Sequence, residues 1–210
     1  MKLGVFGGTF DPVHVGHLIV AEATRVLLGL DEVLFVTAGQ PWFKDDREIT
    51  PAYHRARMVE VAIEGNPHFR TSGMEIARPG PTYTADTLEE LRERRGPDAE
   101  LYVMVGLDAL KEIGRWCRPE RILELGTLVG IARPGCQEPD SESINAVRRG
   151  ASDQVVVVRR PLIGISGSEI RASVAQGTSI KYSVPERVEA YIYEHELYRS
   201  HGDVTGGRRG

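Results

Sequence analysis

Gly7-Gly8-Thr9-Phe10-Asp11-Pro12-Val13-His14-Val15-Gly16-His17-Leu18 is the stretch that decides the fold. It follows an apolar run over residues 2–6, which predicts a buried strand, and it precedes residues 18–28, whose apolar positions recur at helical spacing. The stretch is therefore expected to join a strand to a helix at the carboxyl end of the strand. Open α/β sheets bind their ligands at that end.

The residues of this stretch favour a phosphate site. Gly7 and Gly8 are expected to allow a sharp turn and a close approach of a ligand to the main chain. The helix start that follows offers unpaired N–H groups and the positive end of a dipole. His14 and His17 are expected to share one helical face and to donate to phosphoryl oxygens, with charge if phosphates raise their pKa, and Gly16 leaves room for a phosphate against the backbone. The alternative is a glycine turn with two capping or metal-binding histidines.

Composition limits the classes of function. The chain has 210 residues, a net charge of −4 and ordinary apolar and charged fractions of 41% and 27%, so it lacks the basic footprint of a nucleic-acid-binding protein. Cys117 and Cys136 form no metal-binding motif, which suits a reducing cytoplasm without structural zinc. No signal peptide and no apolar run of about 20 residues is seen. We therefore expect a cytoplasmic protein with one domain over residues 1–199 and a disordered tail over 200–210.

Strand-like and helix-like segments alternate along the chain. Further strands are expected over 33–37, 69–72, 101–105, 128–132 and 155–158. Thr50 is expected to cap a helix that ends at Gly65, and Thr84 to cap a helix over 84–95. This alternation predicts an α/β fold, a Rossmann-like doubly wound parallel sheet with helices on both faces.

Loops after parallel strands gather at one edge of the sheet, and several polar residues fall in those loops. Lys44 is either a point charge for a phosphate or an ordinary surface lysine. Asp108 either accepts hydrogen bonds from ribose hydroxyls or caps the next helix. Ser166 and Glu169 form a capping-box pattern, which predicts a second helix start with Arg171 in its first turns.

The opening motif, Gly7 to Pro12 followed by His14-x-Gly-His17, resembles the signature of the nucleotidylyltransferase superfamily, and within it that of bacterial nicotinate-nucleotide adenylyltransferases. The resemblance runs in order from Leu3 to about Tyr198 and includes Tyr83-Thr84-x-Asp-Thr, Trp116, Ala132-Arg-Pro-Gly and Ile165-Ser-Gly-Ser-x-Ile-Arg. Two segments depart from the family pattern. The loop over 38–44 keeps only the general form and the lysine, and Gly167-Ser168 replaces Ser-Thr.

The resemblance implies a nucleotidylyltransferase-type single domain with a C-terminal helical part. It implies transfer of AMP from ATP to nicotinate mononucleotide, which gives deamido-NAD and pyrophosphate in NAD biosynthesis. Mg²⁺ is expected to arrive on ATP, with no metal site in the protein.

The implied catalytic residues are His14, His17, Lys44 and Arg171. The implied ATP-binding residues are Gly7, Gly8, Thr9, Phe10, Gly16, Gly106, Asp108, Arg133, Ile165, Ser166 and Ser168. The implied residues for nicotinate mononucleotide are Thr9, Lys44, Tyr83, Thr84 and Trp116, with Thr84 near the carboxylate and Trp116 stacked on the pyridine ring.

Three alternatives remain open. Phosphopantetheine adenylyltransferases and cytidylyltransferases share the glycine-histidine loop, although the former are generally shorter and lack the tyrosine-threonine and tryptophan pairing. A non-catalytic nucleotide sensor with the same fold would bind ATP without turnover. The expected partners are ATP and nicotinate mononucleotide, with neither nucleic acid nor membrane, and a homo-oligomer is left open.

Overall fold

The computed structural model describes residues 1–40, 49–137 and 141–199. Within these residues, six strands form one sheet in the order β3-β2-β1-β4-β5-β6, and all its pairings are parallel. The strands are β1 (Lys2–Gly8), β2 (Glu32–Thr37), β3 (Phe69–Ser72), β4 (Glu100–Gly106), β5 (Gly126–Ile131) and β6 (Val155–Val158). The strand order reverses between β1 and β4, which is the switch point where doubly wound sheets bind ligands.

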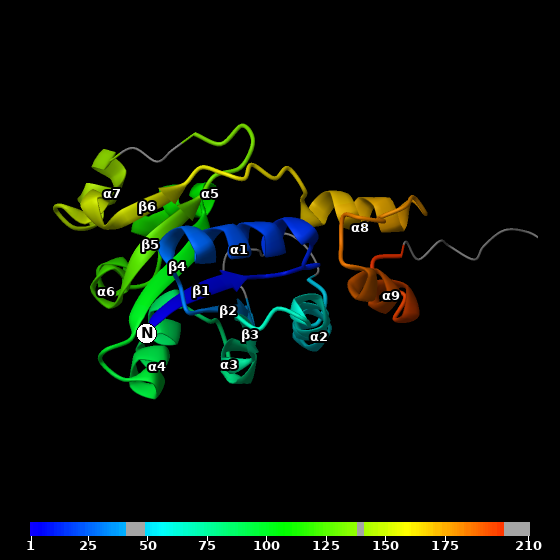
Figure 1. The fold of residues 1–210 in the computed structure, drawn as a ribbon, viewed down its shortest axis with the longest axis horizontal. Helices are drawn as coiled ribbons and strands as arrows, with labels where there is room; N and C mark the ends of the chain where they lie inside the picture. The colour runs from blue at the N-terminus through cyan, green and yellow to red at the C-terminus, as the bar shows by residue number, and fades with distance from the viewer. Residues whose placement is uncertain (41–48, 138–140, 200–210) are drawn as a thin grey trace, which may run out of the picture.

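Helices cover both faces of the sheet (Figure 1). One face carries α1 (Val15–Leu28), α2 (Ala52–Ile63), α8 (Gly167–Ala175) and α9 (Glu186–Glu194). The other carries α3 (Met74–Ala77), α4 (Thr84–Arg95), α5 (Leu107–Lys111), α6 (Pro119–Leu125) and α7 (Ser141–Val147), with the 3₁₀ turns η1 (Ile113–Arg115) and η2 (Ala151–Gln154). In Figure 1, α8 and α9 lie together in orange at one end of the molecule, near α2. The expected doubly wound α/β fold with a C-terminal helical part is confirmed.

Two apolar clusters, one on each face, hold these layers together. Side chains alternate along β1, so that Phe6 packs beneath α1, α2, α8 and α9, whereas Leu3 and Val5 pack beneath the other helices. Because both faces are buried, the strands contain nearly continuous apolar runs rather than an alternation of apolar and polar residues. Those runs explain why the strand positions could be predicted.

The observed helix starts correct three expectations. The first helix begins at Val15, three residues before the expected position, because His14 rather than a later residue is its N-cap. Pro51, not Thr50, is the N-cap of α2, while the Thr50 carbonyl accepts from Arg55 Nε at 2.8 Å. Tyr83, with extended backbone, is the N-cap of α4, so Thr84 is the first helical residue and not the cap.

The polar segment 137–152, which gave no clear pattern, contains α7 and part of η2. No helix in the part of the chain that the structure describes is long and apolar enough to cross a membrane. The expected disordered tail over 200–210 lies outside the described residues.

Candidate active site

The loop between β1 and α1 turns at a different residue from the one expected. β1 continues through Gly7 and Gly8, and the left-handed backbone falls at Phe10, with φ of 49°. The expectation that the glycines make the turn is therefore wrong. A Cβ at Gly8 would lie 2.9 Å from the Phe10 ring, whereas Gly7 faces open space. The glycines serve instead to remove side chains where the strand ends, so that the main chain is accessible.

His14 and His17 lie together at the start of α1. Their rings stack at 3.7 Å between centroids with 23° between planes, because His14 is the N-cap and His17 lies three residues later. The His14 backbone N–H donates to His17 Nδ1 at 3.2 Å. An accepting ring nitrogen carries no proton, so the neutral His17 ring presents Nε2–H as its donor.

His14 is electrostatically different from its neighbour. It is buried, with 4% of its surface exposed. Burial first, and the charge of Arg133 second, lower the pKa of His14 to about 4, so the ring is neutral at pH 7 without a ligand. The expected charge on this histidine would therefore require a bound anion. A Cβ at Gly16 would come within 2.9 Å of Ile163 and 3.0 Å of the His14 ring, so Gly16 allows these two side chains to pack closely against the helix start.

A cleft of about 670 Å³, here called the larger cleft, opens at the carboxyl ends of β1 and β4. Twelve of the expected site residues line it: Gly7, Gly8, Thr9, Phe10, His14, His17, Gly106, Asp108, Arg133, Ser166, Ser168 and Arg171. A small cavity of about 30 Å³ shares His14, His17 and Arg133 with it and adds Gly16 and Ile165. The sheet edge thus gathers residues from positions 6 to 171 around one space.

The start of α8 forms the wall opposite the glycine loop. Ser166 is its N-cap and its Oγ accepts from the Glu169 N–H at 3.2 Å, which confirms the helix start. The Glu169 carboxylate accepts from Ser166 Oγ at 3.0 Å and not from the Ser166 N–H, so only one of the two bonds of the capping box is present. Arg171 donates to the Asp11 carbonyl at 2.5 Å and to Ser168 Oγ at 3.1 Å. A Cβ at Gly167 would lie 2.9 Å from the Asp11 carbonyl, so the helix start touches the loop closely. Two helix N-termini therefore meet around the larger cleft, which suits a polyphosphate.

Asp108 is placed in the larger cleft and not at a helix cap. Gly106 is the N-cap of α5, so the capping alternative is wrong. The Asp108 carboxylate accepts from Cys136 Sγ at 2.6 Å, and this contact, with burial, raises the pKa of the Cys136 thiol. The exposed carboxylate remains at the cleft wall, where a ribose hydroxyl could donate to it.

A second cleft of about 180 Å³ lies on the other side of β1, floored by valines of β1, β2 and β4. It shares Gly7, Gly8 and Thr9 with the larger cleft. Its polar wall consists of Glu75, Thr82, Thr84 and Thr87. The two clefts therefore meet at the end of β1.

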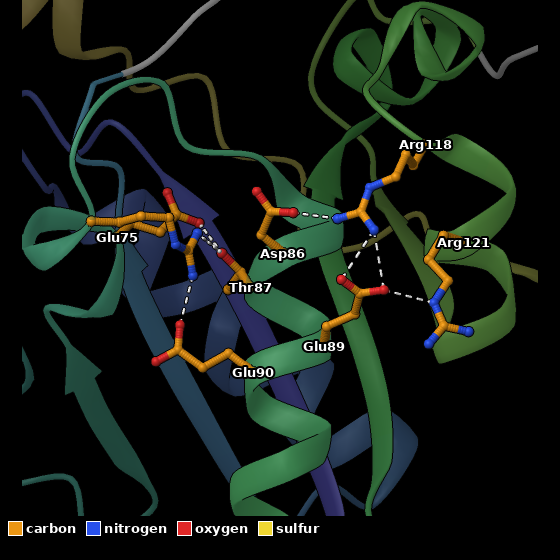
Figure 2. A network of polar contacts seen from close by, with 8 residues as sticks. Glu75, Asp86, Thr87, Glu89, Glu90, Arg118 and Arg121 are labelled. Atoms are coloured by element: carbon orange, nitrogen blue, oxygen red, sulfur yellow. Dashed lines mark hydrogen bonds and ion pairs between the residues drawn. The ribbon is translucent and has the colours of Figure 1, made fainter.

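Sequence reasoning did not identify Glu75 as part of this wall. Figure 2 shows its carboxylate beside Thr87, which donates to it at 2.7 Å, while Arg78 donates to Thr87 and to Glu90. Glu75 is 9% exposed, and burial raises the pKa of its carboxyl. An acidic residue between the apolar Met74 and Ile76 was the available signal.

Sequence reasoning also missed Arg55, whose side chain forms hydrogen bonds with three loops. Arg55 is 1% exposed and donates to the carbonyls of Thr9 at 2.7 Å, Gly39 at 3.1 Å and Thr50 at 2.8 Å. Its position on α2 beside Met58 and the other buried residues of that helix was the available signal, because an arginine at a core position needs partners.

The expected mononucleotide residues are only partly brought together. Thr9 and Thr84 line the second cleft, but half-buried Tyr83 and Trp116 line neither cleft. Trp116 ends η1 and packs against the apolar cluster that also contains the floor of the second cleft. Lys44 lies outside the described residues.

Comparisons with known proteins identify relatives of this chain. A family model described as cytidylyltransferase-like matches residues 5–173. A protein of Thermomicrobium roseum, described as a probable nicotinate-nucleotide adenylyltransferase, is 50% identical over 199 residues, which cover 95% of this chain and 92% of that protein. A protein of Dehalococcoides mccartyi with the same description is 42% identical over 198 residues, covering 94% and 97%.

A solved structure shares the fold. Plasmodium falciparum nicotinic acid mononucleotide adenylyltransferase complexed with NaAD superposes with a TM-score of 0.76 at 21% identity, covering 94% of this chain and 97% of that chain. The fold, the glycine-histidine site and the two relatives lead to one conclusion. The chain belongs to the cytidylyltransferase-like family and, within it, to the nicotinate-nucleotide adenylyltransferases.

Proposed function

We propose that the protein transfers AMP from ATP to nicotinate mononucleotide, giving deamido-NAD and pyrophosphate. The observation that carries the proposal is the pair of clefts that meet at Gly7, Gly8 and Thr9. A triphosphate in the larger cleft and a mononucleotide in the second cleft would bring their phosphates together at the end of β1. The names of the relatives, and the NaAD in complex with the Plasmodium falciparum enzyme, support this choice of substrates.

The reaction needs positioning and charge stabilisation rather than a general base. The phosphate oxygen of the mononucleotide is already an anion; it forms a bond to the α-phosphorus of ATP as the bond from that phosphorus to the pyrophosphate oxygen breaks. His17 Nε2–H donates to an α-phosphoryl oxygen, where negative charge develops. Arg171, held at the Asp11 carbonyl, and Arg133 line the larger cleft and attract the departing pyrophosphate.

On the mononucleotide side, Thr84 begins α4 at the wall of the second cleft. The unpaired N–H groups and dipole of that helix start favour a carboxylate, so the pyridine carboxylate is placed there. Trp116 stacks on the pyridine ring in this proposal, and Lys44 adds a cation to the phosphates.

Mg²⁺ is proposed to enter with ATP, held mainly by phosphate oxygens and water. The donors in the larger cleft fit such an arrangement, because they are hydroxyls and separate carboxylates, and the described residues contain no group of three or more metal-ligating side chains. When bound, the ion would neutralise part of the negative charge of the phosphates. We place the reaction in the cytoplasm, in keeping with the use of cysteine.

Pyrophosphate release tests the proposal. ATP and Mg²⁺ are supplied with nicotinate mononucleotide, nicotinamide mononucleotide or phosphopantetheine in separate reactions. A strong preference for nicotinate mononucleotide is expected. A preference for phosphopantetheine would overturn the assignment of the second cleft, and ATP binding without release from any acceptor would favour the sensor.

A further inference from the structure

One arginine connects the segment that carries Trp116 to the helix that begins at Thr84. Arg118 Nη1 donates to both carboxylate oxygens of Glu89, at 3.1 and 3.0 Å, and Nη2 contacts Asp86. Figure 2 shows this guanidinium reaching across from its own segment to α4, with Arg121 also beside Glu89. Asp86 lies two residues after Thr84, and Arg118 lies two residues after Trp116.

The backbone of Arg118 is left-handed, a conformation in which a glycine would cost less than an arginine. Arg118 is the N-cap of α6, with φ of 53° and ψ of 56°, and Pro119 follows as the first helical residue. This left-handed conformation costs a non-glycine residue about 1–2 kcal/mol, whereas glycine adopts it readily. A glycine at this turn would avoid that cost, but only the arginine supplies a guanidinium that contacts α4.

The ion pairs themselves contribute little stability. The side chains of Arg118, Asp86 and Glu89 are 44%, 36% and 32% exposed, and pairs of this kind are worth about 0–1 kcal/mol each. The planar guanidinium nevertheless fixes direction as well as distance, because Nη1 contacts Glu89 while Nη2 contacts Asp86. The contacts therefore fix the position of the segment that carries Trp116 relative to α4.

That position matters for the second cleft. Trp116 packs against the apolar cluster that contains Ala85 of α4 and Val5 and Val103 of the cleft floor. Both this packing and the Arg118 contacts therefore connect the segment that carries Trp116 to α4, which begins at Thr84.

We propose that Arg118 is a positioning residue for the mononucleotide, which holds Trp116 at the spacing from Thr84 that a pyridine ring requires. The inference rests on the proposed function. It assigns Arg118 no contact with either substrate, and it leaves the larger cleft and its ATP site unaffected.

Steady-state kinetics of four variants test the inference. Arg118→Ala and Arg118→Gly should each raise KM for nicotinate mononucleotide about tenfold, while KM for ATP and kcat stay within about twofold. Arg118→Lys should recover part of the loss, because it restores the charge without the planar guanidinium that contacts Asp86 and Glu89 together. Arg121→Ala is the matched control, since Arg121 pairs with the same Glu89 and with Glu124 but lies within α6, whereas Arg118 precedes that helix and is nearer to Trp116 along the chain. The KM of this variant for nicotinate mononucleotide should change less than twofold.

A coupling measurement separates positioning from a general loss of charge. Asp86→Asn should raise the same KM, and Asp86→Asn combined with Arg118→Ala should be no worse than Arg118→Ala alone. Additive effects, an equal loss in Arg121→Ala, normal kinetics in Arg118→Gly, or a parallel rise in KM for ATP would each overturn the inference. If the wild-type protein releases no pyrophosphate with nicotinate mononucleotide, the proposed function fails first, and the role of Arg118 fails with it.

Discussion

At the scale of single residues, the two stacked histidines have different tasks. His17 has its Nδ1 occupied by the His14 N–H, which leaves Nε2–H as the donor toward a phosphoryl oxygen. His14 is buried and neutral, and its ring supports the His17 ring from one side. The same backbone bond therefore fixes both the tautomer and the orientation of the group proposed to act in the transition state.

Replacing His17 with Ala should lower kcat by about 10²–10³, the effect of removing one donor to a developing oxyanion. KM for nicotinate mononucleotide should change much less, because the donor is used mainly in the transition state. Pyrophosphate release measures both constants, and His68→Ala, at an exposed histidine before β3, is the control. Near-normal turnover of the His17 variant would contradict the assignment.

The buried neutral state of His14 predicts a loss of stability in acid. The pKa of His14 is about 4 in the folded chain and about 6.5 when unfolded, so between these values the unfolded chain binds more protons. Stability therefore falls as pH falls through this window, by about 2.5 kcal/mol between pH 7 and pH 4.5 from this group. Urea unfolding of the wild type and of His14→Gln should show stability curves that converge as the pH is lowered. Parallel curves would show that the pKa of His14 is the same in the folded and the unfolded chain.

At the scale of elements, Arg55 joins three loops that the sheet alone would leave independent. It extends from α2 to the loop after β1 at Thr9, to the loop after β2 at Gly39, and to Thr50 before its own helix. Thr9 belongs to both clefts, so the carbonyl that Arg55 holds lies where the two substrates are proposed to meet.

Arg55→Ala should destabilise the fold by about 3–5 kcal/mol, because buried carbonyls lose a charged donor. Arg55→Lys should lose less, since an ammonium restores the charge but cannot reach all three carbonyls. Urea unfolding measures both, with Arg57→Ala as the control: Arg57 is an exposed arginine of the same helix, paired with Glu60. A change below about 1 kcal/mol in Arg55→Ala would show that solvent replaces the arginine.

The parts of the fold that could be predicted are those encoded locally. The apolar runs of the strands, the helix over 84–95 and the helix start at Ser166 are short-range signals, and each was confirmed at or near its expected position. The caps at Thr50 and Thr84 were wrong because the residue beside each threonine takes the extended backbone that a cap requires.

The parts of the site that could not be predicted depend on contacts between distant segments. The residues of the larger cleft follow parallel strands, so topology alone gathers them. In contrast, the contacts of Arg55 with Gly39 and of Arg118 with Glu89 span different loops and helices. No local spacing encodes such pairs, and only the folded chain shows them.

At the scale of the whole molecule, the end of the described chain returns to the first loop. The Tyr198 hydroxyl donates to Asp11 Oδ1 at 2.8 Å, and burial raises the pKa of that phenol. Asp11 is 6% exposed, and its carbonyl also accepts from Arg171 of α8. Arg171 of α8 and Tyr198, which follows α9, therefore both bond to Asp11 of the glycine-histidine loop. Each lies more than 150 positions away from Asp11 along the chain.

Tyr198→Phe tests whether this closure supports catalysis as well as folding. Removing the hydroxyl deletes a hydrogen bond to a buried carboxylate, which should cost about 1–3 kcal/mol of unfolding free energy. Because Arg171 holds the carbonyl of the same residue, the loop should also shift at the larger cleft, raising KM for ATP more than KM for nicotinate mononucleotide. Tyr193→Phe, at an exposed tyrosine of α9, is the matched control and should change neither. Lost stability with unchanged KM for ATP would show that the C-terminal contact supports the fold alone, since the loop would then keep its shape without Tyr198.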